Sequence, residues 1–381
     1  MDKQKICIIG DGLTGLTTAA ILSKQNLSID LCSGSKKKSN NLDSRTTAIS
    51  ESNLQYIKNI LSLSKHSFFW SCKKINLFFE DKEKIINFLN FDEKNKNFMH
   101  IFQNKDFKKK LNQIILQKSN IKLIKKDIKE INSEGSFLKL ENKKILYDLI
   151  ILCIGSSSKL YSKIENGRSI IKNYEEIAVT GTVKHKAKIE NARQYFLKEG
   201  PLAILPFQKK SFSIVWSINK IYFEDNKHNL KKILMSKLIT LLDTKKIQTI
   251  DNIKSFPINL NLKTKYYKKN ILILGDGLHS VHPLAGQGFN LVLRDIKKLS
   301  ELMLMTSKLG LLFKDSLLLK NFYNSRKGEN NLFGLGINLA NLFFKDYKFF
   351  STFRKEILSN VKNFSFIKKI SQTTADKGIS F

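Results

Sequence analysis

Two glycine-containing segments hold the residues best suited to bind a cofactor. The first, Gly10-Asp11-Gly12-Leu13-Thr14-Gly15, fits the G-x-G-x-x-G pattern and lies between a buried apolar strand and the start of a helix. There the first glycine allows a tight turn, the second lets a pyrophosphate approach the backbone, and the third lets helix and strand pack closely. Free N–H groups at the helix start add partial positive charge for the anion. The segment therefore predicts a bound dinucleotide in preference to a purely structural turn.

The ribose contact of this pattern is unusual. In dinucleotide-binding folds an acidic residue closes the second strand and accepts hydrogen bonds from the ribose hydroxyls. Here that strand ends at Ser33, and Asp30 lies inside the strand, where we expect it to face elsewhere. A serine can hydrogen-bond a ribose but supplies no charge. We therefore expect weaker cofactor binding or compensation by other contacts.

The second segment begins with a buried strand, Ile271 to Leu274, which ends in Gly275-Asp276. A short loop containing His279 and His282 follows, and Pro283-Leu-Ala-Gly-Gln-Gly288 then leads into a helix. Apolar residues at 289, 292, 296, 299 and 303 give that helix one buried face. The segment thus repeats the arrangement of strand, loop and helix start at which anions bind.

The elements around these segments predict an α/β fold, with a Rossmann-like domain interrupted by a mostly antiparallel sheet domain and followed by C-terminal helices. The chain opens as a βαβ unit: strand Lys5–Ile9, helix Leu13–Lys24 and strand Ser28–Cys32. A hairpin is expected at 75–90, a helix at 105–118 and a buried parallel strand at 147–154. From about 175 to 260 apolar and polar residues alternate, as in an antiparallel sheet with one covered face.

These patterns divide the chain into segments of two domains. The dinucleotide-type domain comprises 1–72, 99–172 and 265–381, the last including the C-terminal helices. The sheet domain, expected to bind the substrate, comprises the hairpin 73–98 and residues 173–264.

At residues 271–290 the sequence resembles the second flavin motif of the para-hydroxybenzoate-hydroxylase-type FAD monooxygenases, and most closely the ubiquinone-biosynthesis hydroxylases among them. Arg45-Thr-Thr-Ala-Ile-Ser50 is similar to the arginine motif of that family. The segment 200–206, followed by Ser213-Ile-Val-Trp216, looks like the substrate-sheet signature of its quinone hydroxylases. The resemblance runs from residue 5 to about residue 330 and is patchy between 55 and 145.

The resemblance implies FAD as cofactor and NAD(P)H as reductant. Asp276 would hold the ribityl chain, Arg45 would lie near the flavin and its phosphates, and the helix after Pro283 would face the pyrimidine edge of the flavin. The residues expected to bind the cofactor are Gly10, Gly12, Leu13, Thr14, Gly15, Arg45, Gly275, Asp276, Pro283, Gly286, Gln287, Gly288, Phe289 and Asn290. We assign no catalytic side chain. We also expect no metal site, since no cluster of His, Asp and Glu has metal-ligand spacing.

The implied reaction is hydroxylation of a polyprenylated phenol or quinol in ubiquinone biosynthesis, through a flavin hydroperoxide formed with molecular oxygen. Two alternatives remain open: a monooxygenase of a soluble aromatic compound, and a catalytically impaired flavin-binding subunit of a quinone-synthesis complex. The second is raised by Ile154, which stands where the middle motif of the family has an aspartate, and by Tyr161, which stands where an arginine is usual. Ile154 could equally extend a buried strand while its backbone lines the FAD.

The composition adds a charge of +33 at pH 7, from 66 basic and 33 acidic residues. Only six of the basic residues are arginines, the better residue for bidentate recognition of phosphates and bases, so we expect no nucleic-acid partner. The lysine excess fits the composition of proteins from AT-rich genomes, in which Lys, Asn and Ile codons are all frequent. It also fits an affinity for an anionic membrane surface. The stretch Phe343–Phe350 suits either membrane docking or a core helix with an exposed lysine face.

The four cysteines have no CxxC spacing and are expected to be reduced core residues. No stretch reaches the 18 apolar residues of a membrane span, and the first strand begins too early for a leader peptide. We therefore expect a cytoplasmic protein, peripheral on the inner face of a bacterial inner membrane, with quinone-biosynthesis proteins as further partners.

Overall fold

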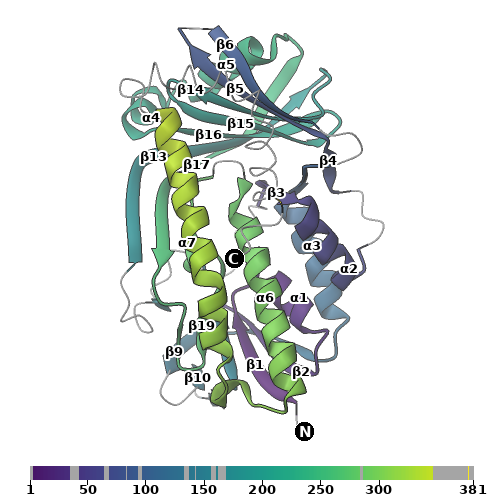
Figure 1. Cartoon of the computed structure of the whole chain (residues 1–381). Coiled ribbons are helices and arrows are strands. Elements are labelled where there is room, and N and C mark those ends of the chain that lie inside the picture. The colour runs from purple at the N-terminus through teal and green to yellow at the C-terminus, as the bar shows by residue number, and fades with distance from the viewer. Residues whose placement is uncertain are drawn as a thin grey trace.

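A parallel sheet forms one end of the molecule (Figure 1). The computed structural model describes residues 3–34, 43–63, 68–82, 84–92, 97–132, 137–141, 143–155, 160–161, 169–283, 286–345 and 376. Six strands lie in the order β18-β19-β12-β1-β2-β8, all parallel except β18. Their bounds are β1 Gln4–Ile9, β2 Leu27–Ser33, β8 Ile121–Lys125, β12 Leu149–Leu152, β18 Tyr267–Lys268 and β19 Ile271–Ile273.

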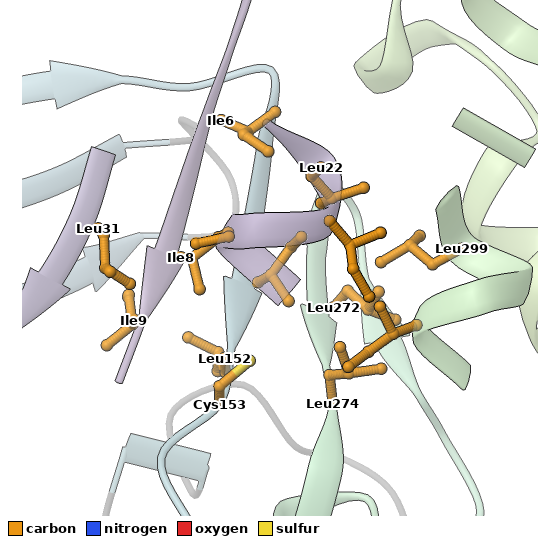
Figure 2. Close-up of a cluster of buried hydrophobic side chains, with 14 of the residues drawn as sticks. Ile6, Ile8, Ile9, Leu22, Leu31, Leu152, Cys153, Leu272, Leu274 and Leu299 are labelled. Atoms are coloured by element: carbon orange, nitrogen blue, oxygen red, sulfur yellow. The ribbon is translucent and has the colours of Figure 1, made fainter. Parts of the chain in front are cut away.

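The core of this end is an aliphatic cluster between the sheet and its helices, α1 (Leu13–Leu22), α2 (Glu51–Leu61) and α3 (Asn104–Leu116). Strand residues 6 to 9 and 149 to 152 are almost fully buried, as expected for parallel strands covered on both faces. Figure 2 shows three members of this cluster that come from different elements: Ile8 of β1, Leu22 of α1 and Leu272 of β19. The packing fixes the carboxyl ends of β1, β12 and β19 beside one another.

The second large sheet lies at the opposite end of the molecule (Figure 1). Its eight strands run in the order β20-β17-β13-β16-β15-β14-β5-β6, and they are antiparallel except between β14 and β5. One face is covered by α4 (Lys220–Asn226) and α5 (Leu230–Leu242), and Phe223 of α4 and three leucines of α5 belong to the same buried cluster as Trp216. The bounds are β20 His279–Ser280, β17 Ile247–Lys263, β13 Ser169–His185, β16 Ser211–Asn219, β15 Gly200–Gln208, β14 Ala192–Leu197, β5 Lys74–Asp81 and β6 Lys84–Asp92.

Smaller elements join the two ends. The sheet β3-β7-β4 lies between them, and the sheet β11-β10-β9 lies beside the parallel sheet. Two long helices, α6 and α7, run side by side along the molecule (Figure 1). The bounds are β3 Thr46–Ser50, β4 Trp70–Cys72, β7 Met99–Gln103, β9 Ile128–Asn132, β10 Phe137–Leu140, β11 Lys143–Leu146, η2 Gly275–Gly277, α6 Gly288–Lys308, η4 Phe313–Asp315 and α7 Leu318–Lys345.

The predicted α/β fold, a Rossmann-like domain interrupted by an antiparallel sheet and followed by helices, is confirmed. Individual boundaries differ: α1 ends at Leu22 rather than Lys24, because the N–H groups of Lys24 and Gln25 bond to carbonyls three residues back instead of four, and the strand expected at 147–154 is limited to Leu149–Leu152. All four cysteines are buried and free. Among the described helices, none is long and apolar enough to cross a membrane.

Candidate functional site

A cavity of about 1020 Å³ lies between the carboxyl ends of the parallel strands and the uncovered face of the eight-stranded sheet. Ten of the fourteen predicted cofactor residues line it: Gly12, Leu13, Thr14, Arg45, Asp276, Pro283, Gly286, Gln287, Gly288 and Phe289. Segments that are far apart in sequence therefore meet at one place. The other four, Gly10, Gly15, Gly275 and Asn290, lie behind this lining.

The glycine turn between β1 and α1 has the geometry its sequence predicts. Gly10 has φ +118°, and a Cβ there would lie 2.3 Å from the Cys153 carbonyl oxygen. At Gly15 a Cβ would lie 1.9 Å from the Gly10 carbonyl oxygen. Gly10 and Gly15 thus permit close packing, whereas Gly12 faces the cavity with no other protein atom within 4 Å of its Cβ position.

Two helix N-termini open onto the cavity without a protein cap. Neither Gly12, the N-cap of α1, nor Gln287, the N-cap of α6, makes a side-chain cap hydrogen bond, and neither helix has an acidic residue in its first turn. In α2, by contrast, the Ser50 hydroxyl accepts a hydrogen bond from the Asn53 N–H and Glu51 lies in the first turn. Uncapped N-termini leave N–H groups and partial positive charge available for an anionic ligand.

The space in front of these termini suits FAD. A Cβ at Gly12, Gly155 or Gly288 would meet no protein atom within 4 Å, and all three glycines line the cavity. The Gln287 side-chain oxygen is buried and has no hydrogen-bond partner among the described residues. A dinucleotide extending from α1 to α6 would occupy the glycine-lined space, with its pyrophosphate at the α1 terminus and its ring system near Gln287.

Asp276 lies in η2 at the carboxyl end of β19 and lines the same cavity. Gly275 before it has φ +81°, and a Cβ there would lie 2.7 Å from the Thr14 side chain, so the two cofactor segments pack directly on each other. Asp276 also contributes to the negative potential that raises the pKa of Arg45.

Arg45 is held in place by Asp43 and Phe256. Its guanidinium donates two hydrogen bonds of 2.8 Å to the Asp43 carboxylate and lies 5.8 Å from the Phe256 ring centroid. The hydrogen bond to Asp43 raises the pKa of Arg45. Burial favours the protonated acid at Asp43, but hydrogen bonds from Arg45 and Asn104 outweigh it and lower the pKa of Asp43. The guanidinium is therefore a fixed positive charge at the cavity wall.

Asn290 is buried and braces the first turn of α6. Its side-chain oxygen accepts hydrogen bonds from the Ser50 N–H at 2.9 Å and from the Asn53 amide at 3.0 Å. Its amide donates to the carbonyls of Ala48, at 3.2 Å, and Gly286, at 3.3 Å. Asn290 thus ties the α6 terminus to strand β3 of the arginine motif.

Sequence reasoning missed several polar residues of the cavity wall, namely Asp43, Asn104 and Lys108. Lys108 of α3 lies 3.7 Å from the Asp11 carboxylate, beside the glycine turn, and brings a positive charge there. In the predicted helix 105–118, the position of Lys108 in the sequence does not distinguish it from the neighbouring lysines. Asp30 does face elsewhere, as expected, because its carboxylate accepts a 2.7 Å hydrogen bond from the Tyr147 hydroxyl.

The middle motif presents its backbone to the cavity. Cys153 and Gly155 line the cavity, whereas the Ile154 side chain packs against the aliphatic core. Tyr161 is buried, and a Cβ at Gly277 would lie 1.8 Å from its hydroxyl. Ile154 lies beyond the end of β12 and so does not extend the strand, but its side chain joins the core, and Tyr161 fills the space beside η2.

Two buried histidines flank the loop that leads to α6. His279 lines the cavity, and its Nε2 lies 2.6 Å from Asp295, which also accepts a 2.6 Å hydrogen bond from Arg326. Burial opposes ionisation of Asp295, but Arg326 and His279 lower its pKa. The His282 Nε2 lies 2.7 Å from the Glu176 carboxylate on β13. Both imidazoles are engaged with carboxylates and position the loop.

Phe343 of the aromatic and basic stretch belongs to α7 and lines the cavity, packing against the cluster of Phe79, Phe88 and Phe196. Residues 346–350 of that stretch lie outside the described residues.

Comparisons with known proteins agree with this geometry. The FAD binding domain family matches residues 150–308. The mitochondrial ubiquinone biosynthesis monooxygenase of Dictyostelium discoideum is 26% identical, over 96% of this chain and 89% of that protein. The ubiquinone hydroxylase UbiL of Rhodospirillum rubrum is 28% identical, over 42% of this chain and 38% of that protein. The crystal structure of p-nitrophenol 4-monooxygenase from Pseudomonas putida covers 97% of each chain, with a TM-score of 0.77 and 13% identity.

The match to the p-nitrophenol 4-monooxygenase structure shows a shared fold. The sequence matches add a similarity to proteins of ubiquinone biosynthesis. The chain thus contains a match to the FAD binding domain family and is similar to the FAD-dependent monooxygenases, including the ubiquinone-biosynthesis hydroxylases.

Proposed function

We propose that this monooxygenase hydroxylates the ring of a polyprenylated phenol or quinol in ubiquinone biosynthesis, with NAD(P)H as reductant. The observation that carries the proposal is the continuity of the cavity, which extends from two uncapped helix N-termini to a largely apolar sheet face. The relatives named for ubiquinone biosynthesis support this choice of substrate.

The chain's own residues would bind and orient the reactants. The α1 N-terminus and Lys108 would hold the pyrophosphate, and Asp276 the ribityl hydroxyls. The α6 N-terminus would stabilise negative charge at the pyrimidine edge of the flavin. Bound FAD supplies the redox chemistry, accepting electrons from NAD(P)H and passing them to oxygen. The apolar walls of the sheet face would exclude water from the reacting ring.

The test is turnover with defined rings. FAD-loaded protein is mixed with NADH or NADPH and a prenylated phenol, and the ring product is identified by mass spectrometry in ¹⁸O₂. Ring-dependent NAD(P)H oxidation and one incorporated ¹⁸O atom are expected. A preference for an untailed aromatic acid would favour the soluble-substrate alternative. Bound FAD that neither NADH nor NADPH reduces with any ring would favour the flavin-binding subunit.

We also propose that the protein meets its substrate at an anionic membrane, as a peripheral cytoplasmic protein. The net charge of +33 supports attraction to such a surface, which salt would weaken. Co-sedimentation with vesicles containing phosphatidylglycerol at 20 mM salt, and release at 500 mM, is expected. A protein that ignores these vesicles at low salt would overturn the membrane proposal and leave the ring chemistry untouched.

A further inference from the structure

The uncovered face of the eight-stranded sheet presents an ordered row of side chains to the cavity. In the strand register Leu89 pairs with Leu77, Leu77 with Gln194, Gln194 with Ala203, Ala203 with Val215 and Val215 with Thr180. All six line the cavity. Because register partners lie side by side on the same face, the row crosses β6, β5, β14, β15, β16 and β13 without a break.

The row changes character along its length. At the β6 and β5 end the neighbouring side chains are apolar, and Phe88, Phe196 and Phe343 join Leu77 and Leu89 in one cluster that reaches the cavity. At the other end lie Thr180, Thr182 and Ser213, and the Ser213 hydroxyl is hydrogen-bonded to that of Thr46 in the arginine motif. The apolar end thus lies away from the flavin segments, and the polar end lies next to them.

Gln194 marks the boundary. It is 8% exposed and lines the cavity between Leu77 and Ala203. Its side-chain amide makes no hydrogen bond with any described residue, yet neither of its polar atoms is sealed from the cavity. An amide in such apolar surroundings gains most from a ligand that can both donate and accept a hydrogen bond. By contrast, the Ser213 and Thr46 hydroxyls are already hydrogen-bonded to each other.

We propose that Gln194 is the specificity-determining residue for the substrate, binding the hydroxyl of a phenol whose isoprenoid tail extends along the Leu77 and Leu89 end of the row. A phenol hydroxyl can donate to the amide oxygen and accept from its NH₂ group. The tail then lies against the phenylalanine cluster, and the ring lies toward Ser213 and the flavin segments. This inference rests on the proposed function and adds how the ring is oriented.

The test compares ligands that differ by one feature. Dissociation constants of 2-geranylphenol, its methyl ether and unsubstituted phenol are measured from the change that each causes in the visible absorption of bound FAD. In Gln194→Met, which keeps the side-chain length, 2-geranylphenol should bind about tenfold more weakly. The methyl ether should lose less than twofold. In Leu89→Asn, 2-geranylphenol should weaken about tenfold while phenol is unchanged.

Gln208→Met, at an exposed position on β15, is the matched control and should alter none of the constants. If Gln194→Met does not retain FAD, Gln194→Asn replaces it, with the same loss expected because the shortened amide no longer reaches the hydroxyl. Equal losses for the phenol and its methyl ether, or no loss for either, would overturn the assignment of Gln194. A wild-type protein that binds 2-geranylphenol without hydroxylating it would contradict the proposed function but leave the binding comparison valid.

Discussion

The His282 Nε2 lies 2.7 Å from the Glu176 carboxylate, and this pair joins the loop before α6 to strand β13 of the eight-stranded sheet. Both side chains are almost fully buried, and the Tyr174 ring stands edge-on to the imidazole, with centroids 5.3 Å apart. Val281 and Pro283, on either side of His282, line the cavity. The pair therefore fixes the loop that faces the cofactor against the sheet that faces the substrate.

Replacing His282 with alanine should lower the free energy of unfolding by about 3 kcal/mol, because it leaves the buried Glu176 carboxylate without the imidazole. Glu176→Gln should cost less, since the amide can still hydrogen-bond a neutral imidazole and carries no charge. Urea unfolding at pH 7.5 measures both, with His228→Ala at an exposed position as control. Equal small effects of all three variants would show that the pair contributes little.

The two glycines of the first motif should respond differently to substitution. Gly12→Val should leave the apoprotein as stable as wild type, because Gly12 has φ −74° and no protein atom near its Cβ position. The valine would occupy cofactor space, so FAD should bind at least about tenfold more weakly. Gly15→Ala should instead destabilise the apoprotein itself, through the contact with the Gly10 carbonyl. Flavin fluorescence titration and apoprotein melting separate the two effects.

His185 should make the protein less stable as the pH falls below about 6.5. Burial lowers the pKa of His185 despite the 2.9 Å hydrogen bond from its Nδ1 to the Ala187 carbonyl, and its Nε2 has no partner among the described residues. Since the unfolded chain binds the proton more tightly, protonation favours unfolding, and stability rises with pH through this window. His185→Asn keeps a donor and should reduce the loss between pH 7.5 and 5.5 in urea unfolding. An identical loss in wild type and variant would exclude His185 as the source.

The sequence predicts the parts of the site that depend on local pattern. A strand, a glycine turn and a helix start are contiguous in the chain, so the places of Gly12 and Asp276 at the cavity follow from their motifs. The sheet face does not follow, because the row through Gln194 depends on the register of six strands drawn from residues 77 to 215. The second flavin motif also does not reveal that Asn290 lies behind the cavity wall. The direction of its side chain depends on how α6 is rotated against β3.

Asn290→Ala tests whether this residue acts by bracing α6. The substitution leaves the Ser50 N–H and the Ala48 carbonyl without their partner, so the free energy of unfolding should fall by about 2 kcal/mol. Because Asn290 does not line the cavity, apoprotein and FAD-loaded protein should be destabilised by similar amounts. Asn324→Ala, at an exposed position on α7, provides the control. A variant with an unchanged apoprotein and weaker FAD binding would instead mean that Asn290 contacts the cofactor directly, as a binding residue of the second flavin motif.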